Sequence, residues 1–168
     1  MLYNPLIPAI EEFQGQYRFL SNFWRVVVTF DGMTFRSVEH AFQAAKTHDR
    51  AHRLAIQACI KPGEAKRKGR MVTLRPDWEK VKLEVMLGLI REKFSYPSLR
   101  DKLLTTGEAE LVEGNDWGDT FYGRCGGTGQ NHLGKMLMRV RNELRAPLPS
   151  NVQDTDDIPY GDGYGSGE

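Results

Sequence analysis

The sequence predicts an α+β fold, namely a single, mainly helical domain with a small antiparallel β element. Three observations support this prediction. Residues 38–60 and residues 77–94 carry apolar side chains at helical spacing. Asp31-Gly32, a typical turn dipeptide, separates two short segments rich in Val, Phe and Thr, as in a β-hairpin. The chain of 168 residues is close to the length of one domain, and it shows no internal repeat.

The predicted helices begin at capping residues and continue as apolar stripes. The helix at residues 38–60 follows Ser37, a preferred N-cap residue. The helix at residues 77–94 begins at Asp77 and has the clearest pattern, with an apolar stripe formed by Leu83, Met86, Leu87, Ile90 and Phe94. Shorter helices are expected at residues 99–105 and 133–144, and a glycine-rich stretch separates them.

The composition of the chain changes near its C-terminus. Residues 146–168 contain seven Gly or Pro residues and five acidic residues but no Lys or Arg. Such a segment buries too little apolar surface to offset its ordering entropy, so we expect an acidic disordered tail. The folded domain is expected at residues 15–145, after an N-terminal extension of residues 1–14. The formal net charge of +1 therefore divides into −5 in the tail and +6 in the remainder, which holds 23 basic and 17 acidic residues.

Several classes of protein are excluded by what the sequence lacks. No apolar run approaches the roughly 20 residues that span a membrane, and no secretory signal is visible, so we expect a cytoplasmic monomer without a membrane partner. Cys59 and Cys125 are too few for a disulfide framework, and the His and Cys spacing matches no metal site, so we expect neither metal nor cofactor. Residues 129–135 have nearly the spacing of a P-loop, but Met136 replaces the Ser or Thr that holds magnesium.

One face of the helix after Ser37 carries candidate reactive groups. Glu39, Gln43 and Lys46 are spaced i, i+4 and i+7, so their side chains project from the same side. Glu39 lies in the first turn, where the helix dipole favours a carboxylate. A carboxylate and an amine held together by a helix form a candidate catalytic pair. The alternative is an exposed Glu–Lys stripe on an amphipathic helix.

Aromatic and polar side chains alternate without a regular period in residues 17–24, at Trp78 and in residues 115–123. Such segments suit a flat polar ligand such as a nucleobase, because its faces stack and its edges form hydrogen bonds. The alternative is that these aromatic residues belong to the core. Asp119 lies in a loop without an apolar pattern, where functional groups concentrate.

Positive charge gathers in two segments. Residues 61–70 are basic, and they form either a solvated loop and helix end or a contact to phosphate or nucleic acid. Backbone amides of residues 127–134 precede a predicted helix and, with Lys135, can hold a phosphate group.

Five sequence blocks follow one another in an order typical of one family. They are Phe19-Leu-Ser-Asn-Phe23, Ser37-Val-Glu-His-Ala-Phe-Gln-Ala-Ala-Lys46, Trp78 with Lys82 and Met86, Leu111-Val-Glu-Gly-Asn-Asp-Trp-Gly-Asp119, and Gly127-Thr-Gly-Gln-Asn-His-Leu-Gly-Lys-Met-Leu-Met138. Together they resemble the YbiA-like family, also called the NADAR domain family, over about residues 15–145. The resemblance implies a hydrolase, an N-glycosidase that cleaves a ribosyl C1–N bond.

The resemblance implies roles for several residues. Glu39, Lys46 and Asp119 are expected to be catalytic: a carboxylate stabilises the positive charge that develops at C1′, and a neutral lysine can form an imine with the opened sugar. Glu39 opposes the neutral form of Lys46, and the sequence leaves this conflict open. The residues expected to bind substrate are Asn22, Phe23, Trp24, His40, Gln43, Arg70, Trp78, Trp117, Tyr122, Gly129, Asn131 and Lys135. At Tyr122 the chain departs from the family pattern, which has Trp or a short Gly-rich stretch there.

The family activities suggest two substrates. The first is ADP-ribose attached to guanine bases of nucleic acid such as DNA, which an ADP-ribosyl glycohydrolase removes. The second is a phosphorylated ribosylamino intermediate of riboflavin biosynthesis. Two non-catalytic alternatives are a module that binds ADP-ribose or NAD, against which Glu39, Lys46 and Asp119 argue, and a nucleic-acid-binding protein, for which no motif is present.

Overall fold

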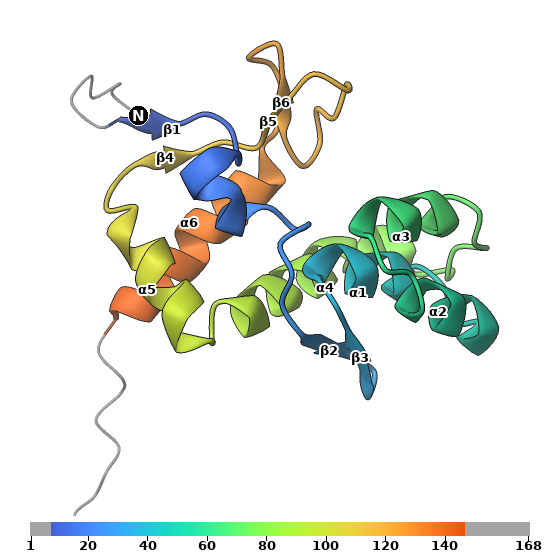
Figure 1. The fold of residues 1–168 in the computed structure, drawn as a ribbon. Coiled ribbons are helices and arrows are strands. Elements are labelled where there is room, and N and C mark those ends of the chain that lie inside the picture. Colours follow the sequence, from blue (N-terminus) through green and yellow to red (C-terminus); the bar gives the residue numbers. More distant parts are fainter. Residues whose placement is uncertain (1–7, 147–168) are drawn as a thin grey trace, which may run out of the picture.

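Helices make up most of the regular structure in residues 8–146, the part of the chain that this computed structural model describes (Figure 1). The helices are a 3-10 helix, η1 (Gly15–Leu20), followed by α1 (Val38–Ala45), α2 (Arg50–Gln57), α3 (Pro62–Gly69), α4 (Trp78–Lys93), α5 (Pro97–Thr105) and α6 (His132–Arg145). The strands are β1 (Ala9–Ile10), β2 (Val28–Phe30), β3 (Met33–Phe35), β4 (Glu110–Leu111), β5 (Gly114–Asn115) and β6 (Arg124–Cys125). The predicted fold class, a mainly helical α+β domain, is confirmed.

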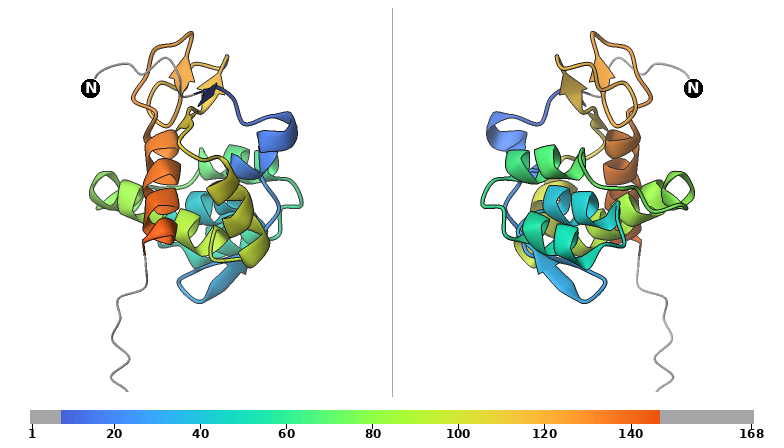
Figure 2. Two further views of the ribbon diagram at one scale, coloured as in Figure 1. Left: turned by 90° about the vertical axis from the view of Figure 1, so that its left-hand side faces the viewer. Right: turned by 90° about the vertical axis from the view of Figure 1, so that its right-hand side faces the viewer.

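Helix α4 connects the two sides of the domain. Figure 1 shows α1, α2 and α3 on one side and α5 and α6 on the other, with α4 running between them. The predicted apolar stripe agrees with this position, because Met86 and Ile90 are buried and α4 contacts α1, β2 and α6. Figure 2 shows that the segment with β5 and β6 projects beyond the N-terminal end of α6.

The predicted β-hairpin is present as β2 and β3. Asp31 and Gly32 both have positive φ angles, 46° and 73°, as the tight turn between paired antiparallel strands requires. Two further pairs, β1 with β4 and β5 with β6, are parallel and were not predicted. Their strands are two residues long, so they leave no periodic pattern in the sequence.

The prediction of one helix over residues 38–60 is wrong. Helix α1 ends at Ala45, and α2 begins after Asp49, whose Oδ1 accepts the backbone N–H of Ala51 at 2.8 Å as an N-cap. Most of the basic stretch at residues 61–70 forms the separate helix α3, so its structure is not the loop and helix end that is one of the two expectations for it.

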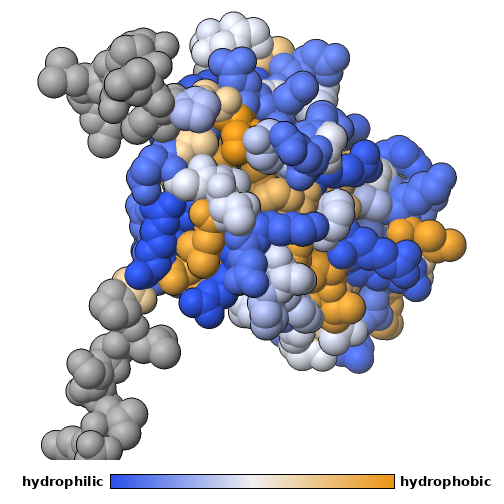
Figure 3. All heavy atoms as spheres, turned by 60° about the vertical axis from the view of Figure 1, so that its left-hand side comes forward, coloured by the Kyte–Doolittle hydropathy of each residue, from blue (hydrophilic) through white to orange (hydrophobic). Residues whose placement is uncertain are grey.

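The folded domain begins earlier than the predicted boundary at Gly15. Strand β1 pairs with β4, and both Ile10 and Phe13 are buried in the core. Residues 1–7 lie outside the described residues, as does the predicted tail at residues 146–168 apart from Ala146. On the face drawn in Figure 3, apolar patches are small and lie among hydrophilic residues. No helix between residues 8 and 146 is long and apolar enough to cross a membrane.

Candidate active site

A cavity of about 380 Å³ is lined by side chains of α1, α3 and α4, of residues 13–23 around η1, and of residues 113–122. Its charged lining residues are Arg18, Glu39, Lys46, Lys66, Glu113 and Asp119. Its aromatic lining residues are Phe13, Phe23, Phe42, Trp117 and Tyr122. Three carboxyl groups and three basic groups thus share a space with stacking surfaces. Such a mixture of polar and apolar groups is typical of a site for a small polar ligand.

Helix α1 forms the wall that carries the predicted catalytic pair. Glu39, Gln43 and Lys46 all line the cavity, and Gln43 Nε2 donates a hydrogen bond to Glu39 Oε1 at 2.7 Å. Every residue of α1 is buried, and Glu39 is only 7% exposed. The alternative of an exposed Glu–Lys stripe is therefore wrong.

Two contacts hold α1 in place, one at its N-terminus and one where α3 packs against Gln43. At its N-terminus, Ser37 Oγ accepts the backbone N–H of His40, and the His40 ring joins Ser37 Oγ to the carbonyl of Cys59 at the end of α2. At Gly69, α3 approaches α1 so closely that a Cβ atom would lie 1.9 Å from Gln43 Oε1. His40 thus fixes the helix rather than facing the cavity.

Burial shifts the pKa values of the predicted catalytic pair, Glu39 and Lys46, in opposite directions. It raises the pKa of Glu39, although the hydrogen bond from Gln43 and the nearby Lys66 and Lys46 partly oppose this shift. It lowers the pKa of Lys46, against the opposing effect of Glu39 and with help from the positive charges of Lys66 and Arg70. The net shift for Lys46 is downward in spite of Glu39, and this direction favours the neutral amine that imine formation requires.

The second wall of the cavity is the irregular loop at residues 113–122, which lies far from α1 in the sequence. Asp119 Oδ1 accepts the backbone N–H groups of Phe121 and Tyr122 at 3.0 and 2.9 Å. Asn115 holds the same loop from inside, because its Nδ2 donates to the carbonyl of Asp119 at 2.8 Å and its Oδ1 accepts the backbone N–H of Asp119 at 3.0 Å. These bonds fix the Asp119 carboxylate in a segment without regular structure.

Of the predicted site residues, about half meet at the cavity. Asn22, Phe23, Glu39, Gln43, Lys46, Trp117, Asp119 and Tyr122 line it. Trp24, His40, Arg70, Trp78, Gly129, Asn131 and Lys135 are not part of its lining.

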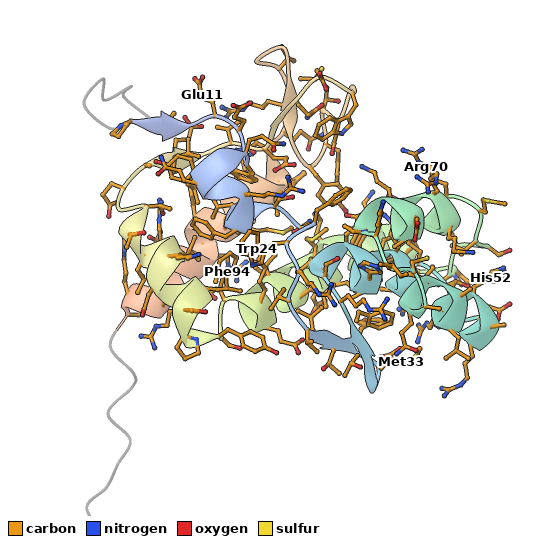
Figure 4. All side chains as sticks on the ribbon, in the orientation of Figure 1. Glu11, Trp24, Met33, His52, Arg70 and Phe94 are labelled. Atoms are coloured by element: carbon orange, nitrogen blue, oxygen red, sulfur yellow. The ribbon has the colours of Figure 1, made fainter. Side chains whose placement is uncertain are left out.

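The remaining predicted residues lie behind or beside the cavity. Trp78 is buried, and its ring centroid is 5.1 Å from that of Phe42, which lines the cavity. Trp24 lies instead under Lys102, whose Nζ is 5.6 Å from the ring centroid. Figure 4 shows Arg70 at the outer edge of α3.

Three residues of the glycine-rich stretch and α6 also lie outside the lining. Asn131 ties two segments together, since its Nδ2 donates to the carbonyl of Leu111 and its Oδ1 accepts the backbone N–H of Glu113. Gly129 lies against the backbone of Thr120. Lys135 is exposed on α6.

Three charged residues of the cavity were missed as site residues: Arg18, Lys66 and Glu113. Lys66 Nζ lies 5.9 Å from the ring centroid of Phe23 and 5.8 Å from that of Trp117. Weak signals existed for all three. Arg18 belongs to the first aromatic segment, Lys66 to the basic stretch, and Glu113 to the block that ends at Asp119. None of these signals shows which side chain turns inward.

A second, larger groove of about 860 Å³ adjoins the cavity and shares Gln14, Gly114 and Trp117 with it. Its charged lining residues, Glu11, Glu12 and Asp116, are all acidic. It therefore lacks the amine and the mixed charge of the cavity, and we place the chemistry in the smaller space. Within residues 8–146 no group of three or more His, Cys, Asp or Glu side chains could hold a metal ion.

The fold and the site define a small α+β enzyme domain whose cavity brings carboxyl groups and lysines together. The NADAR domain family matches residues 10–145. N-glycosidase YbiA of Escherichia coli is 40% identical over 135 residues, which cover 76% of this chain and 82% of that protein. An N-glycosidase of Nostoc punctiforme is 40% identical over 137 residues, with 77% and 86% covered.

A solved structure and a longer relative extend the comparison. The NMR structure of E. coli YbiA superposes with a TM-score of 0.72 at 38% identity and covers 83% of this chain and 86% of that one. A riboflavin biosynthesis protein of Vibrio vulnificus is 37% identical over 138 residues, which cover 80% of this chain but 37% of that protein. The chain belongs to the NADAR domain family. The predicted enzyme class, a hydrolase acting on N-glycosyl bonds, is confirmed.

Proposed function

We propose that this N-glycosidase cleaves the bond between C1′ of a phosphorylated ribose and a base, and that its substrate is ADP-ribose attached to guanine in nucleic acid. The arrangement at the cavity mouth supports this proposal. Lys66 Nζ lies 5.9 and 5.8 Å from the ring centroids of Phe23 and Trp117, which are 37% and 57% exposed. Two exposed rings suit stacking on a base, and a cation near both of them suits a phosphate group.

The charges around the cavity favour one direction for the phosphate groups. Lys66 and Arg18 line the cavity, and α3 continues outward with the exposed side chains of Arg67 and Lys68. The adjoining groove, by contrast, carries acidic side chains that repel phosphate. The substrate therefore extends from the cavity along α3, where a nucleic-acid backbone meets positive charge.

The two walls supply the groups that the reaction needs. Cleavage of the C1′–N bond develops positive charge at C1′, which the carboxyl groups of Glu39 and Asp119 stabilise. In the imine route, the neutral amine of Lys46 forms a bond to C1′ as the C1′–N bond breaks, and the base leaves with the electron pair and takes up a proton. The ring oxygen then leaves C1′ as the imine forms, and water hydrolyses the imine to the free sugar and the restored amine. The lowered pKa of Lys46 supports this route.

A second candidate substrate is a phosphorylated ribosylamino-pyrimidine. Relatives from Vibrio vulnificus and maize are named riboflavin biosynthesis proteins, and they contain this domain as part of longer chains. This substrate also has a ribosyl C1′–N bond, and its single phosphate would occupy the place near Lys66.

The decisive experiment incubates the full chain with an oligonucleotide that carries ADP-ribosylated guanine and, separately, with the ribosylamino-pyrimidine phosphate. Mass spectrometry detects the released base or sugar. We expect release from the oligonucleotide. Release from the pyrimidine alone would establish the second candidate instead, and release from neither would contradict both.

Borohydride trapping tests the imine route independently. With whichever of the two substrates the enzyme cleaves, we expect a covalent adduct on the wild-type chain. The control variant Lys80→Ala, which removes an exposed lysine of α4, should also form it. The adduct should be absent from Lys46→Ala, since that variant lacks the amine. An adduct that persists in Lys46→Ala, or none in the wild type, would contradict the route.

A further inference from the structure

Glu113 occupies an unusual position in the loop wall of the cavity. Its backbone is clamped on both sides, because its N–H donates to Asn131 Oδ1 at 3.0 Å and its carbonyl accepts the N–H of Arg124 at 2.9 Å. Gly123 presses against it, since a Cβ at Gly123 would lie 3.1 Å from Glu113 Cγ. The side chain is thereby held at the cavity, which it lines.

The carboxyl of Glu113 is the least satisfied of the three that line the cavity. Glu113 Oε2 is shielded from solvent and has no hydrogen-bond partner among the described residues. In contrast, Glu39 accepts a hydrogen bond from Gln43, and Asp119 accepts two from the backbone. A buried carboxylate oxygen without a donor is costly, whereas a protonated carboxyl can remain there.

The charges around Glu113 favour retention of its proton. Burial, assisted by the negative charges of Asp119 and Glu39, raises the pKa of Glu113 to about 7. Lys66 and Lys93 act in the opposite direction. Lys93 is itself buried behind the site, where its Nζ donates to the carbonyl of Ser21 at 2.7 Å, and burial lowers its pKa to about 7. Burial thus weakens the charge with which Lys93 opposes the proton on Glu113.

We propose that Glu113 is the general acid that protonates the departing base. This assignment rests on the ribosyl C1′–N cleavage proposed above. The C1′–N bond breaks with its electron pair on the base nitrogen, the Glu113 proton forms the new N–H bond, and Glu113 becomes a carboxylate. Water supplies the hydroxyl group at C1′, and the proton that it loses returns to Glu113, so the residue is restored after each turnover.

This assignment separates the tasks of the two walls. Helix α1 provides Lys46 for attack at C1′, and the loop provides the proton for the leaving group. A neutral base departs as an unstable anion unless it is protonated, and general acid catalysis contributes about 10²–10⁴-fold to such a step. A cationic base such as a pyridinium departs without a proton and does not need this help.

The leaving group therefore provides the test. The variant Glu113→Gln keeps the shape of the side chain but cannot transfer a proton. With a neutral base, we expect kcat/KM to fall by about 10²-fold or more. With the same ribosyl phosphate attached to a pyridinium, we expect a loss of less than about 3-fold, because no proton is needed. Glu84→Gln, an exposed change on α4, is the matched control and should behave as the wild type.

The pH dependence of the wild-type enzyme tests the same point without a variant. The acid must be protonated, so kcat/KM for the neutral base should decline above pH about 7, and this decline should be absent for the pyridinium substrate. Equal losses on both substrates in Glu113→Gln, or the same decline for both in the wild type, would overturn the assignment. If the wild type cleaves neither substrate, the proposed ribosyl cleavage itself fails.

Discussion

The two walls of the cavity position their functional groups by different physical means. Helix α1 places Glu39, Gln43 and Lys46 by its regular period and holds them by burial on every side. The loop between Glu113 and Asn131 contains only the short strands β5 and β6, and it places its carboxyl groups through hydrogen bonds from side chain to backbone. The helix thus depends on apolar packing, and the loop depends on a few polar side chains.

This difference predicts where the domain tolerates the loss of a single polar side chain. Packing in α1 is shared among many neighbours, so the loss of one polar contact there leaves the helix in place. In the loop, Asn115, Asp119 and Asn131 each satisfy two or more backbone groups, and nothing described replaces them. Removal of one such side chain leaves buried donors and acceptors without partners.

The largest effects on catalysis should come from charge removal in either wall. Glu39→Gln and Asp119→Asn should each lower kcat/KM by about 10³-fold, because each removes a carboxylate that stabilises charge at C1′. Asparagine retains an Oδ1 acceptor for the two backbone N–H groups, so the melting temperature of Asp119→Asn should stay near that of the wild type. Full activity in either variant would exclude that carboxyl from the reaction.

The largest effect on stability should come from the loop. Asn131→Ala leaves the carbonyl of Leu111 and the N–H of Glu113 without their partners. We expect the free energy of unfolding in urea to fall by about 2–3 kcal/mol. Activity should fall as well, because the position of Glu113 is lost. Asn142→Ala, an exposed change on α6, is the control, and equal effects of both changes would refute the structural role of Asn131.

A smaller effect is expected where α3 supports α1. In Gly69→Ala the new Cβ would lie 1.9 Å from Gln43 Oε1, so Gln43 or the helix must move. Overpacking of this kind costs about 1–3 kcal/mol, and displacement of Gln43 should also reduce kcat/KM. Gly63→Ala in the same helix meets nothing within 4 Å and should be neutral or slightly stabilising. If both variants unfold at the same urea concentration, the close contact between α1 and α3 does not matter for stability.

The smallest effect should arise far from both walls. Glu143 on α6 accepts hydrogen bonds from Arg91 and Arg139, which lower the pKa of its carboxyl from 4.5 to about 2. Since the pKa is lowered in the folded protein, this stabilisation is present above pH 4.5 and is lost as the pH falls towards 2. The groups are exposed, so Glu143→Gln should cost about 0.5 kcal/mol at pH 7. Urea unfolding should show the variant and the wild type converging in acid, with activity unchanged at pH 7.

Much of the wall formed by α1 could be predicted from the sequence, because the spacing of residues along a helix shows which side chains project from the same face. Glu39, Gln43 and Lys46 line the cavity together, as their spacing predicts. Of the loop residues that line the cavity, the sequence predicts only Trp117, Asp119 and Tyr122 as site residues. The inward turn of Glu113 could not be predicted, since it depends on Asn131 and Gly123, which are distant in sequence or silent in pattern.

The sequence by itself determined the helical face of α1, the apolar stripe of α4, the β2–β3 turn and the membership of a family, because each depends on local order along the chain. Only the tertiary structure decided that α2 starts anew at Asp49, that Trp78 lies behind the cavity, and that Lys66 and Glu113 enter it. These outcomes depend on which elements pack together and how closely. Burial then follows from packing, and it is burial that shifts the pKa values of Lys46 and Glu113.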